Sequence, residues 1–278
     1  MTSPAPDGLG AVFDDASEGF AVWTPLLWDP VGAATVDAAD LKPGDHVLDA
    51  CCGNGAAALP AGSAVGPLGR VDGVDLAPAL IGAARARAVE AGLDHVRFHV
   101  ADVTGWRSPE AQPYDALTCV FGVFFLPGMD AAVARLLGLL RPGGRFALTV
   151  WSSGSVEPLV APFVSAAGTE LRAAGRTPPG PGAALRESER LGTAEGLDAW
   201  LRDLGAEDAR VRPIELRITL TDDLAWHFVT GAAPRALLYG LDEAAVARVR
   251  RAYTAELQRR EIRTFHASAL IGTGTRPA

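Results

Sequence analysis

Short apolar runs alternate with helical patterns through the first half of the chain. Five runs rich in branched and aromatic residues predict strands, at 46–50, 70–75, 96–101, 114–120 and 144–151. Pro78 to Ala91 predicts a helix with an early proline and a stop at Gly92. Asp130 begins another, whose apolar face is Val133, Leu136, Leu137 and Leu140. This alternation is typical of a parallel sheet with right-handed crossovers.

The pattern changes after Trp151. A stretch rich in proline and glycine, Pro178 to Gly182, predicts a loop or hinge. One apolar helical stripe then ends at Gly205, and 208–220 predicts another strand. Two helices, at about 222–239 and 242–261, precede a final strand near 263–273. Helices between the last two strands would form a lobe over the edge of the sheet.

Composition narrows the class of protein. Hydrophobic residues make up 49% of the 278 residues and charged residues 21%, as in a folded globular chain of enzyme size. The net charge of -8, with Lys42 as the only lysine, disfavours a protein that binds nucleic acid by neutralising phosphates. The longest apolar run, Ala116 to Leu126, has eleven residues, whereas a membrane span needs about 20. We expect neither a nucleic-acid partner nor a membrane span.

The cysteines and the N-terminus bear on location. Cys51, Cys52 and Cys119 have neither the number nor the spacing of a disulfide framework or a zinc site, so we expect no metal and a reducing compartment. The N-terminus shows no basic stretch followed by an apolar core, the pattern of a signal peptide. These features favour the cytoplasm.

The densest chemical signal lies where three strands end. Asp49 ends the first strand and is followed by small turn residues, Asp75 ends the second strand, and Asp102 follows the third. The carboxyl ends of parallel strands meet at the edge where open α/β sheets bind ligands. There Asp75 can accept both hydroxyls of a ribose, while Asp102 and the Val103 amide can pair with an adenine edge. Three acids would repel a pyrophosphate but suit a nucleoside that carries positive charge, such as S-adenosylmethionine.

At this point the chain resembles the class I S-adenosylmethionine-dependent methyltransferases, particularly the broad group related to the quinone-biosynthesis (type 11) methyltransferases. The resemblance rests on VLDACCGNG (47–55), GRVDGVDL (69–76), FHVADV (98–103), YDALTCVFGVFFLP (114–127) and LRPGGRFALTVW (140–151). It implies an α/β fold with a seven-stranded, mostly parallel, Rossmann-like sheet. Its three expected parts are an N-terminal helical cover (1–40), a cofactor-binding core (41–151), and a C-terminal part with a substrate-covering helical insertion before the last strand (152–278).

The resemblance also implies a binding site for S-adenosylmethionine, with S-adenosylhomocysteine as product. Its expected residues are Asp49 and the backbone of Cys51, Gly53 and Gly55 around the methionine moiety, Asp75 on the ribose, Leu76, Asp102 and Val103 on the adenine, and Cys119 near the sulfonium. Cys51 stands where the family usually has its first glycine, which would strain a backbone of positive φ. Taken singly, each acid also fits a solvated turn residue, and Gly53-x-Gly55 fits a loose dinucleotide pattern.

The acceptor site is less clearly marked. His227, between Trp226 and Phe228, lies in the predicted lobe and is our candidate general base. The alternative is a partly buried histidine that packs between aromatic neighbours. Aromatic residues near the predicted site are candidate substrate contacts or core residues: Trp28, Phe121, Phe124 and Trp226.

The predicted function is methylation of a small natural product, with an aromatic or polyketide-like acceptor, in secondary metabolism. Two alternatives stay open: a cyclase-type enzyme of the same fold that keeps the cofactor without methylating, and a nicotinamide-binding oxidoreductase. Oligomeric state cannot be predicted from these patterns.

Overall fold

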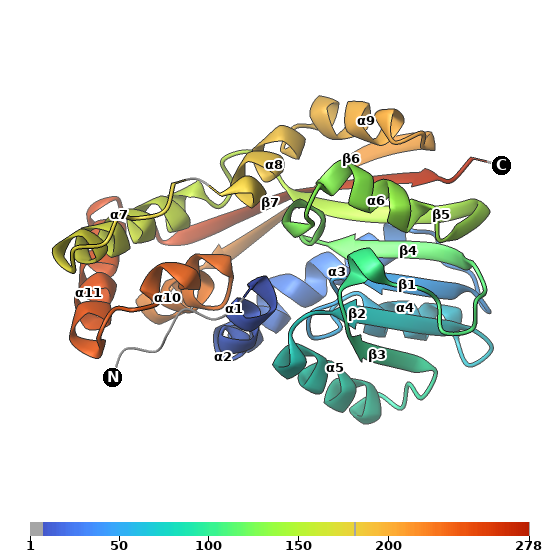
Figure 1. The fold of residues 1–278 in the computed structure, drawn as a ribbon, viewed down its shortest axis with the longest axis horizontal. Coiled ribbons are helices and arrows are strands. Elements are labelled where there is room, and N and C mark those ends of the chain that lie inside the picture. The colour runs from blue at the N-terminus through green and yellow to red at the C-terminus, as the bar shows by residue number, and fades with distance from the viewer. Residues whose placement is uncertain (1–7, 181, 278) are drawn as a thin grey trace.

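A seven-stranded sheet, in the order β3-β2-β1-β4-β5-β7-β6, organises the computed structural model, which describes residues 8–180 and 182–277 (Figure 1). Its strands are β1 (His46–Ala50), β2 (Arg70–Asp75), β3 (Val96–Val100), β4 (Tyr114–Val120), β5 (Leu140–Trp151), β6 (Glu207–Thr219) and β7 (Thr264–Thr275). β7 runs antiparallel to both of its neighbours, and the other pairs are parallel. The predicted fold class is confirmed.

One strand begins earlier than expected. β5 starts at Leu140 instead of residue 144, because Leu140 pairs with Tyr114 before the register shifts and Arg145 pairs with Ala116. The intervening Pro142-Gly143-Gly144 segment forms the irregularity, with Gly143 at φ 69°. A glycine is suited to such a bulge because it has no Cβ to clash at positive φ.

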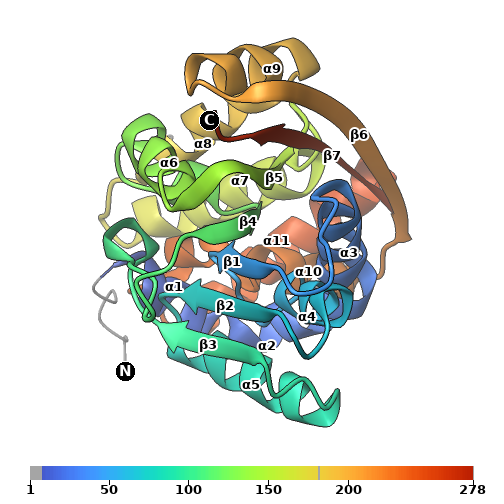
Figure 2. The same cartoon turned by 90° about the vertical axis from the view of Figure 1, so that its right-hand side faces the viewer.

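Helices cover both faces of the sheet, with α4 and α6 on opposite faces in Figure 2. α3 (Asp29–Ala38), α4 (Ala58–Val65) and α5 (Pro78–Glu90) share one buried cluster with β1 to β3, whereas α6 (Met129–Leu137) and α9 (Ala194–Asp203) belong to the main core. The sequence shows no helical stripe at α4. Its small residues instead allow close approach to the sheet, and a Cβ on Gly62 would lie 2.3 Å from the Val96 side chain.

The N-terminal cover is helical, as predicted. α1 (Leu9–Asp15) and α2 (Ser17–Trp23) are followed by a π-helical segment, η1 (Thr24–Trp28), that leads into α3. Trp23 is fully buried, and its Nε1 donates a 3.1 Å hydrogen bond to the Leu224 carbonyl. This bond joins the cover to a segment about 200 residues further along the chain.

The helical insertion before the last strand is also present. It comprises α10 (Asp222–Thr230), a 3-10 segment η4 (Ala233–Leu238) and α11 (Glu243–Arg259). The single helix predicted over 222–239 is wrong, since α10 ends at Thr230 with Gly231 as its C-cap, and a separate segment with Pro234 in its first turn begins at Ala233. α7 (Glu157–Ala173) and α8 (Ala183–Leu191) were not predicted, and the loop expected at 178–182 lies between them, with Pro181 outside the described residues.

Figure 1 shows α7, α10 and α11 gathered beyond one end of the sheet. Residues of the cover, the sheet and the insertion share one hydrophobic cluster, exemplified by Trp23, Leu48 and Tyr253. The division of the chain into three parts stays a prediction. Within the described residues, no helix combines the length and apolar character needed to cross a bilayer.

Candidate functional site

A cavity of about 410 Å³ lies at the carboxyl ends of β1 to β5, beneath α1, α2 and α10. Its two sides differ in chemistry. The "carboxylate side" consists of lining residues at the ends of β1, β2 and β3: Asp49, Cys51, Cys52, Gly53, Asp75, Leu76, Asp102 and Val103. The "aromatic side" consists of the lining aromatic residues Phe13, Phe20, Trp28, Phe121, Phe124, Phe125, Trp151 and Phe228 with the apolar residues around them. The three predicted acids therefore face one space.

Asp49 is the most deeply buried of the acids, with 1% of its surface exposed. Its Oδ1 accepts a 2.7 Å hydrogen bond from the Thr118 hydroxyl, while its Oδ2 is buried without a partner among the described residues. Burial raises the pKa of Asp49 to about 7. A cationic group in the cavity would stabilise the ionised carboxylate and satisfy the free oxygen.

Asp75 anchors the turn that follows β1. Its Oδ2 accepts from the Gly53 N–H and its Oδ1 from the Ala77 N–H, both at 2.9 Å. Burial raises the pKa of this carboxyl. Each oxygen keeps a further lone pair, so the carboxylate can still accept from two hydroxyls of a ligand.

Asp102 is exposed at the rim of the cavity. Its Oδ1 accepts from the backbone N–H and the hydroxyl of Thr104, at 2.8 and 2.7 Å, and so caps the short 3-10 segment η2 (Val103–Gly105). Its other oxygen has no partner among the described residues. Nearby, α1 packs so closely on Leu76 that a Cβ on Gly10 would lie 2.9 Å from the Leu76 Cβ. α1 thus covers this edge of the site.

The three cysteines differ in their relation to the cavity, which Cys51 and Cys52 line. Cys51 has φ 54°, so the residue in place of the family glycine does adopt a left-handed backbone. The hydrogen-bonded Cys119 thiol and burial raise the pKa of Cys51, and burial raises that of Cys52, which keeps both thiols protonated. Cys119 itself is fully buried and is not a lining residue. Gly55 does not line the cavity either, and lies against Phe98 and Ala84.

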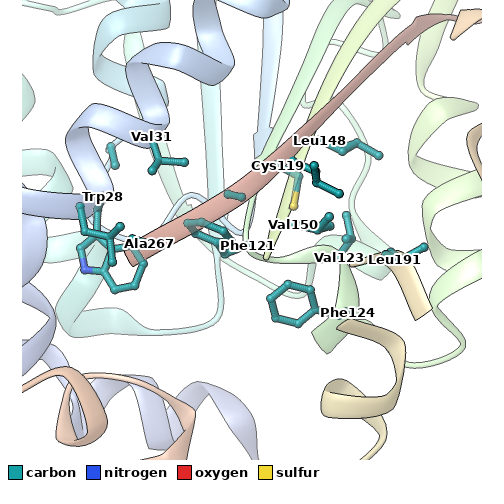
Figure 3. Close-up of a cluster of buried hydrophobic side chains, with 14 of the residues drawn as sticks. Trp28, Val31, Cys119, Phe121, Val123, Phe124, Leu148, Val150, Leu191 and Ala267 are labelled. Carbon is teal, nitrogen blue, oxygen red and sulfur yellow. The ribbon is translucent and has the colours of Figure 1, made fainter. Parts of the chain in front are cut away.

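Aromatic rings contact one another across the opposite side. Phe121 stacks on Trp151, with ring centroids 3.8 Å apart, and Trp28 meets Phe121 edge-on at 6.0 Å. Figure 3 shows Trp28 and Phe121 next to each other. Phe20 in turn stacks on Trp28 at 4.9 Å. Of the candidate substrate contacts, Trp28, Phe121 and Phe124 thus reach the cavity.

The structure does not bring His227 or Trp226 to the cavity. Trp226 packs against Phe163 and Tyr253 of α7 and α11, with the Arg250 guanidinium over its ring. Neither residue is among those that line the cavity, whereas the next one, Phe228, is. Consecutive residues of a helix point about 100° apart, so α10 directs only Phe228 to this space.

Sequence reasoning did not assign Trp151 or Phe228 to the site. Trp151 ends β5 at the same sheet edge as Asp49, a position that could have identified it. Phe228 had no such signal, because the rotation of α10 decides its direction. Within the described residues, no group of three or more His, Cys, Asp or Glu side chains could hold a metal ion.

Comparison with known proteins agrees with this geometry. Residues 47–144 match the family model of a methyltransferase domain. This part of the chain is therefore similar to a methyltransferase domain. The domain contains Asp49, Asp75 and Asp102, and therefore the whole carboxylate side.

Two curated relatives resemble about half of this chain. The chain is 36% identical over 137 residues to aklanonic acid methyltransferase DauC of Streptomyces sp. strain C5, covering 49% of this chain and 62% of that protein. It is 35% identical over 152 residues to nocamycin O-methyltransferase of Saccharothrix syringae, covering 55% and 50%. The chain thus spans only half to about three fifths of these relatives.

Solved structures show the same fold. A putative methyltransferase from Bacillus halodurans aligns with a TM-score of 0.56 at 15% identity, over 89% of this chain and 99% of that one. The [4+2]-cyclase SpnF aligns with a TM-score of 0.55 at 18% identity, over 100% of both chains. At such identities the likeness establishes the fold alone.

Proposed function

We propose that this protein transfers a methyl group from S-adenosylmethionine to a small molecule with an aromatic or polyketide-like acceptor group. The observation that carries the proposal is a single cavity with three carboxylates on one side and aromatic rings on the other. The first side suits a cationic nucleoside, and the second suits a flat apolar acceptor. The names of the two relatives, both methyltransferases, support the same class of reaction.

On the carboxylate side we assign one part of the cofactor to each acid. Asp75 would accept from the ribose hydroxyls, and Asp102 with the Val103 amide would pair with the adenine, against which Leu76 would lie. The free oxygen of Asp49, and the backbone of the turn around Cys51 and Gly53, would hold the methionine moiety. When bound, the cofactor supplies an activated methyl group and leaves as S-adenosylhomocysteine.

On the aromatic side, Trp28, Phe121 and Phe124 would hold the acceptor together with Trp151 and Phe228. Their rigid, mutually packed rings would fix the plane of the acceptor and so align its nucleophilic atom with the methyl group. Alignment of this kind can account for up to about 7–11 kcal/mol of a barrier. We leave His227 and Trp226 out of this mechanism, because neither lines the cavity.

Charge, cysteine content and the names of the relatives support a kind of partner, a cellular location and a metabolic role for the proposed reaction. The net charge of -8 favours a small-molecule partner over a nucleic acid. Three cysteines without a disulfide support the cytoplasm, and the natural-product names of the relatives support secondary metabolism. Appearance of a labelled methyl group in product would distinguish this reaction from a cyclase-type one.

The test compares Asp75 with Asp102 by calorimetric titration of S-adenosylhomocysteine. Asp75→Ala should weaken binding by about 1.5–3 kcal/mol, the range for lost hydrogen bonds to a charged group. Asp102→Ala should cost less, because Asp102 is exposed and the Val103 amide remains.

Asp75→Asn is the control for damage to the turn after β1, since the Asn amide oxygen can still accept the hydrogen bond from the Gly53 N–H. Both Asp75 variants should weaken binding while the unfolding transition stays cooperative. Full affinity in a folded Asp75→Ala protein would refute the ribose assignment, and a larger loss in Asp102→Ala would refute the placement of adenine.

A further inference from the structure

We infer that the acceptor binds as a planar aromatic anion whose charge is balanced by the sulfonium of the cofactor, with no base from the protein. This inference rests on the proposed function and deepens it. The acceptor class is an acidic phenol, an enol or an aromatic carboxylic acid, each of which ionises near neutral pH without help.

The distribution of titratable groups around the cavity is the first observation. Every titratable side chain that lines it belongs to the carboxylate side: Asp49, Cys51, Cys52, Asp75 and Asp102. Among the described residues, the aromatic side is lined only by apolar and aromatic side chains. An acceptor held there meets neither a histidine nor a lysine nor an arginine.

None of the five titratable groups is free to remove a proton from the acceptor. The thiols of Cys51 and Cys52 stay protonated, and Asp75 and Asp102 accept hydrogen bonds from the backbone near the ribose and adenine positions. Asp49 alone has a free buried oxygen, which the ammonium of the bound cofactor would occupy. The acceptor must therefore lose its proton to water before transfer.

Charge balance is the second observation. A buried anion is costly unless a cation lies beside it, and the described lining offers no cationic side chain. The sulfonium is the positive charge available at the reacting end of the cavity. Anion and sulfonium should therefore increase each other's affinity by the same factor.

Methyl transfer then removes both charges at once. A lone pair of the acceptor forms the bond to the methyl carbon, the carbon–sulfur bond breaks, and its electrons convert the sulfonium to a neutral thioether. No proton moves in this step. The neutral product and S-adenosylhomocysteine lose their attraction, which favours release.

Trp151 is the positioning residue that this arrangement singles out. The Nε1 of Trp28 donates to the Phe20 carbonyl at 3.1 Å, so that donor is already used. Trp151, stacked on Phe121 with only 11° between the ring planes, makes no side-chain hydrogen bond to any described residue. Trp151 is half-buried and lines the cavity, so an oxygen of the acceptor would give its indole N–H a partner.

The test measures binding of 2-naphthoate, a planar aromatic anion, and of 2-naphthamide, its uncharged counterpart. Each is titrated into the protein saturated with sinefungin, which carries a protonated amine where the cofactor carries its methylsulfonium, or with S-adenosylhomocysteine, which carries no charge there. Naphthoate should bind the sinefungin complex at least about tenfold more tightly than the S-adenosylhomocysteine complex. Naphthamide should bind both within about twofold.

Equal naphthoate affinity in the two complexes, or no naphthoate binding to the sinefungin complex, would overturn the inference. The titrations that saturate the protein with sinefungin or S-adenosylhomocysteine come first, and they show whether these two ligands bind before naphthoate or naphthamide is added. Failure of both ligands to bind would refute the proposed function, and this inference with it.

Trp151→Phe tests the donor while keeping an aromatic ring. It should lower naphthoate affinity of the sinefungin complex by about tenfold, the loss of one hydrogen bond to a charged group, and leave sinefungin affinity in place. Trp200→Phe is the matched control, because the Trp200 Nε1 donates to Asp130 and Trp200 does not line the cavity. Unchanged naphthoate affinity in Trp151→Phe, or an equal loss in both variants, would remove Trp151 from this role.

Discussion

The carboxylate side and the aromatic side of the cavity are assembled in different ways. The first comes from the ends of β1, β2 and β3, where each acid lies within two residues of the last residue of its strand. The second comes from the cover, the ends of β4 and β5, and helix α10, which are separated by up to about 200 residues. Under the proposed function, acceptor specificity could therefore change through the cover and insertion while the carboxylate side stays intact.

The two sides nevertheless meet at a pair of strained residues. Cys51 after β1 and Phe121 after β4, both lining the cavity, have φ 54° and 53°. A left-handed backbone is costly for a residue with a Cβ, and such positions cluster at functional sites. Between them Gly122 is required, because a Cβ there would lie 2.5 Å from the Cys51 Cβ.

The largest expected effect concerns charge on the carboxylate side. The pKa of Asp49 rises from 3.8 to about 7 on folding, so between these values the folded protein binds more protons than the unfolded chain. Stability of the free protein should therefore fall as pH rises through this window, by about 1.4 kcal/mol per pH unit from this group. Urea unfolding between pH 4 and 8 should show the free energy of unfolding of Asp49→Asn rising, relative to that of the wild type, until about pH 7. A difference that stays constant with pH would contradict this.

The next effect concerns the helix crossing that builds the aromatic side. A Cβ on Gly231 would lie 2.4 Å from the backbone of Gly19, where α10 crosses α2 next to Phe20. Gly231→Ala should destabilise the protein by about 1–3 kcal/mol and weaken naphthoate binding more than S-adenosylhomocysteine binding. Thermal unfolding and the two titrations measure these quantities.

Gly82→Ala is the control for this substitution. Gly82 lies within α5 with no atom within 4 Å of a built Cβ, so alanine there should stabilise the helix by up to about 1 kcal/mol. If Gly231→Ala also stabilised the protein, or weakened the binding of naphthoate and S-adenosylhomocysteine equally, the crossing of α10 over α2 would not determine the shape of the aromatic side.

The smallest effect concerns strain at Cys51. Cys51→Gly and Cys51→Ala both remove the thiol, but only alanine keeps a Cβ at positive φ. The glycine variant should be the more stable of the two by about 0.5–1 kcal/mol, after the entropic cost of glycine is included. Chemical denaturation of the two proteins gives this difference directly, and a more stable alanine variant would show that the turn relaxes without strain.

The sequence alone was sufficient for the seven strands, apart from the start of β5, and for the three acids near strand ends. Those features depend on local patterns, since a strand and the residue that ends it are contiguous, and parallel strands bring their carboxyl ends to one edge. The positive φ at Cys51 was foreseeable only through the family resemblance, because the family usually has a glycine at this position.

Tertiary structure decided which residues of the insertion reach the cavity. Trp226, His227 and Phe228 are consecutive aromatic side chains on one helix, and no local pattern says which of them faces the site. The contact of Gly231 with Gly19, and the packing of Trp226 on α7 and α11, fix the rotation of α10 so that Phe228 faces inward. Because these partners lie up to about 200 residues away, side-chain direction here is a property of the packed molecule rather than of the segment.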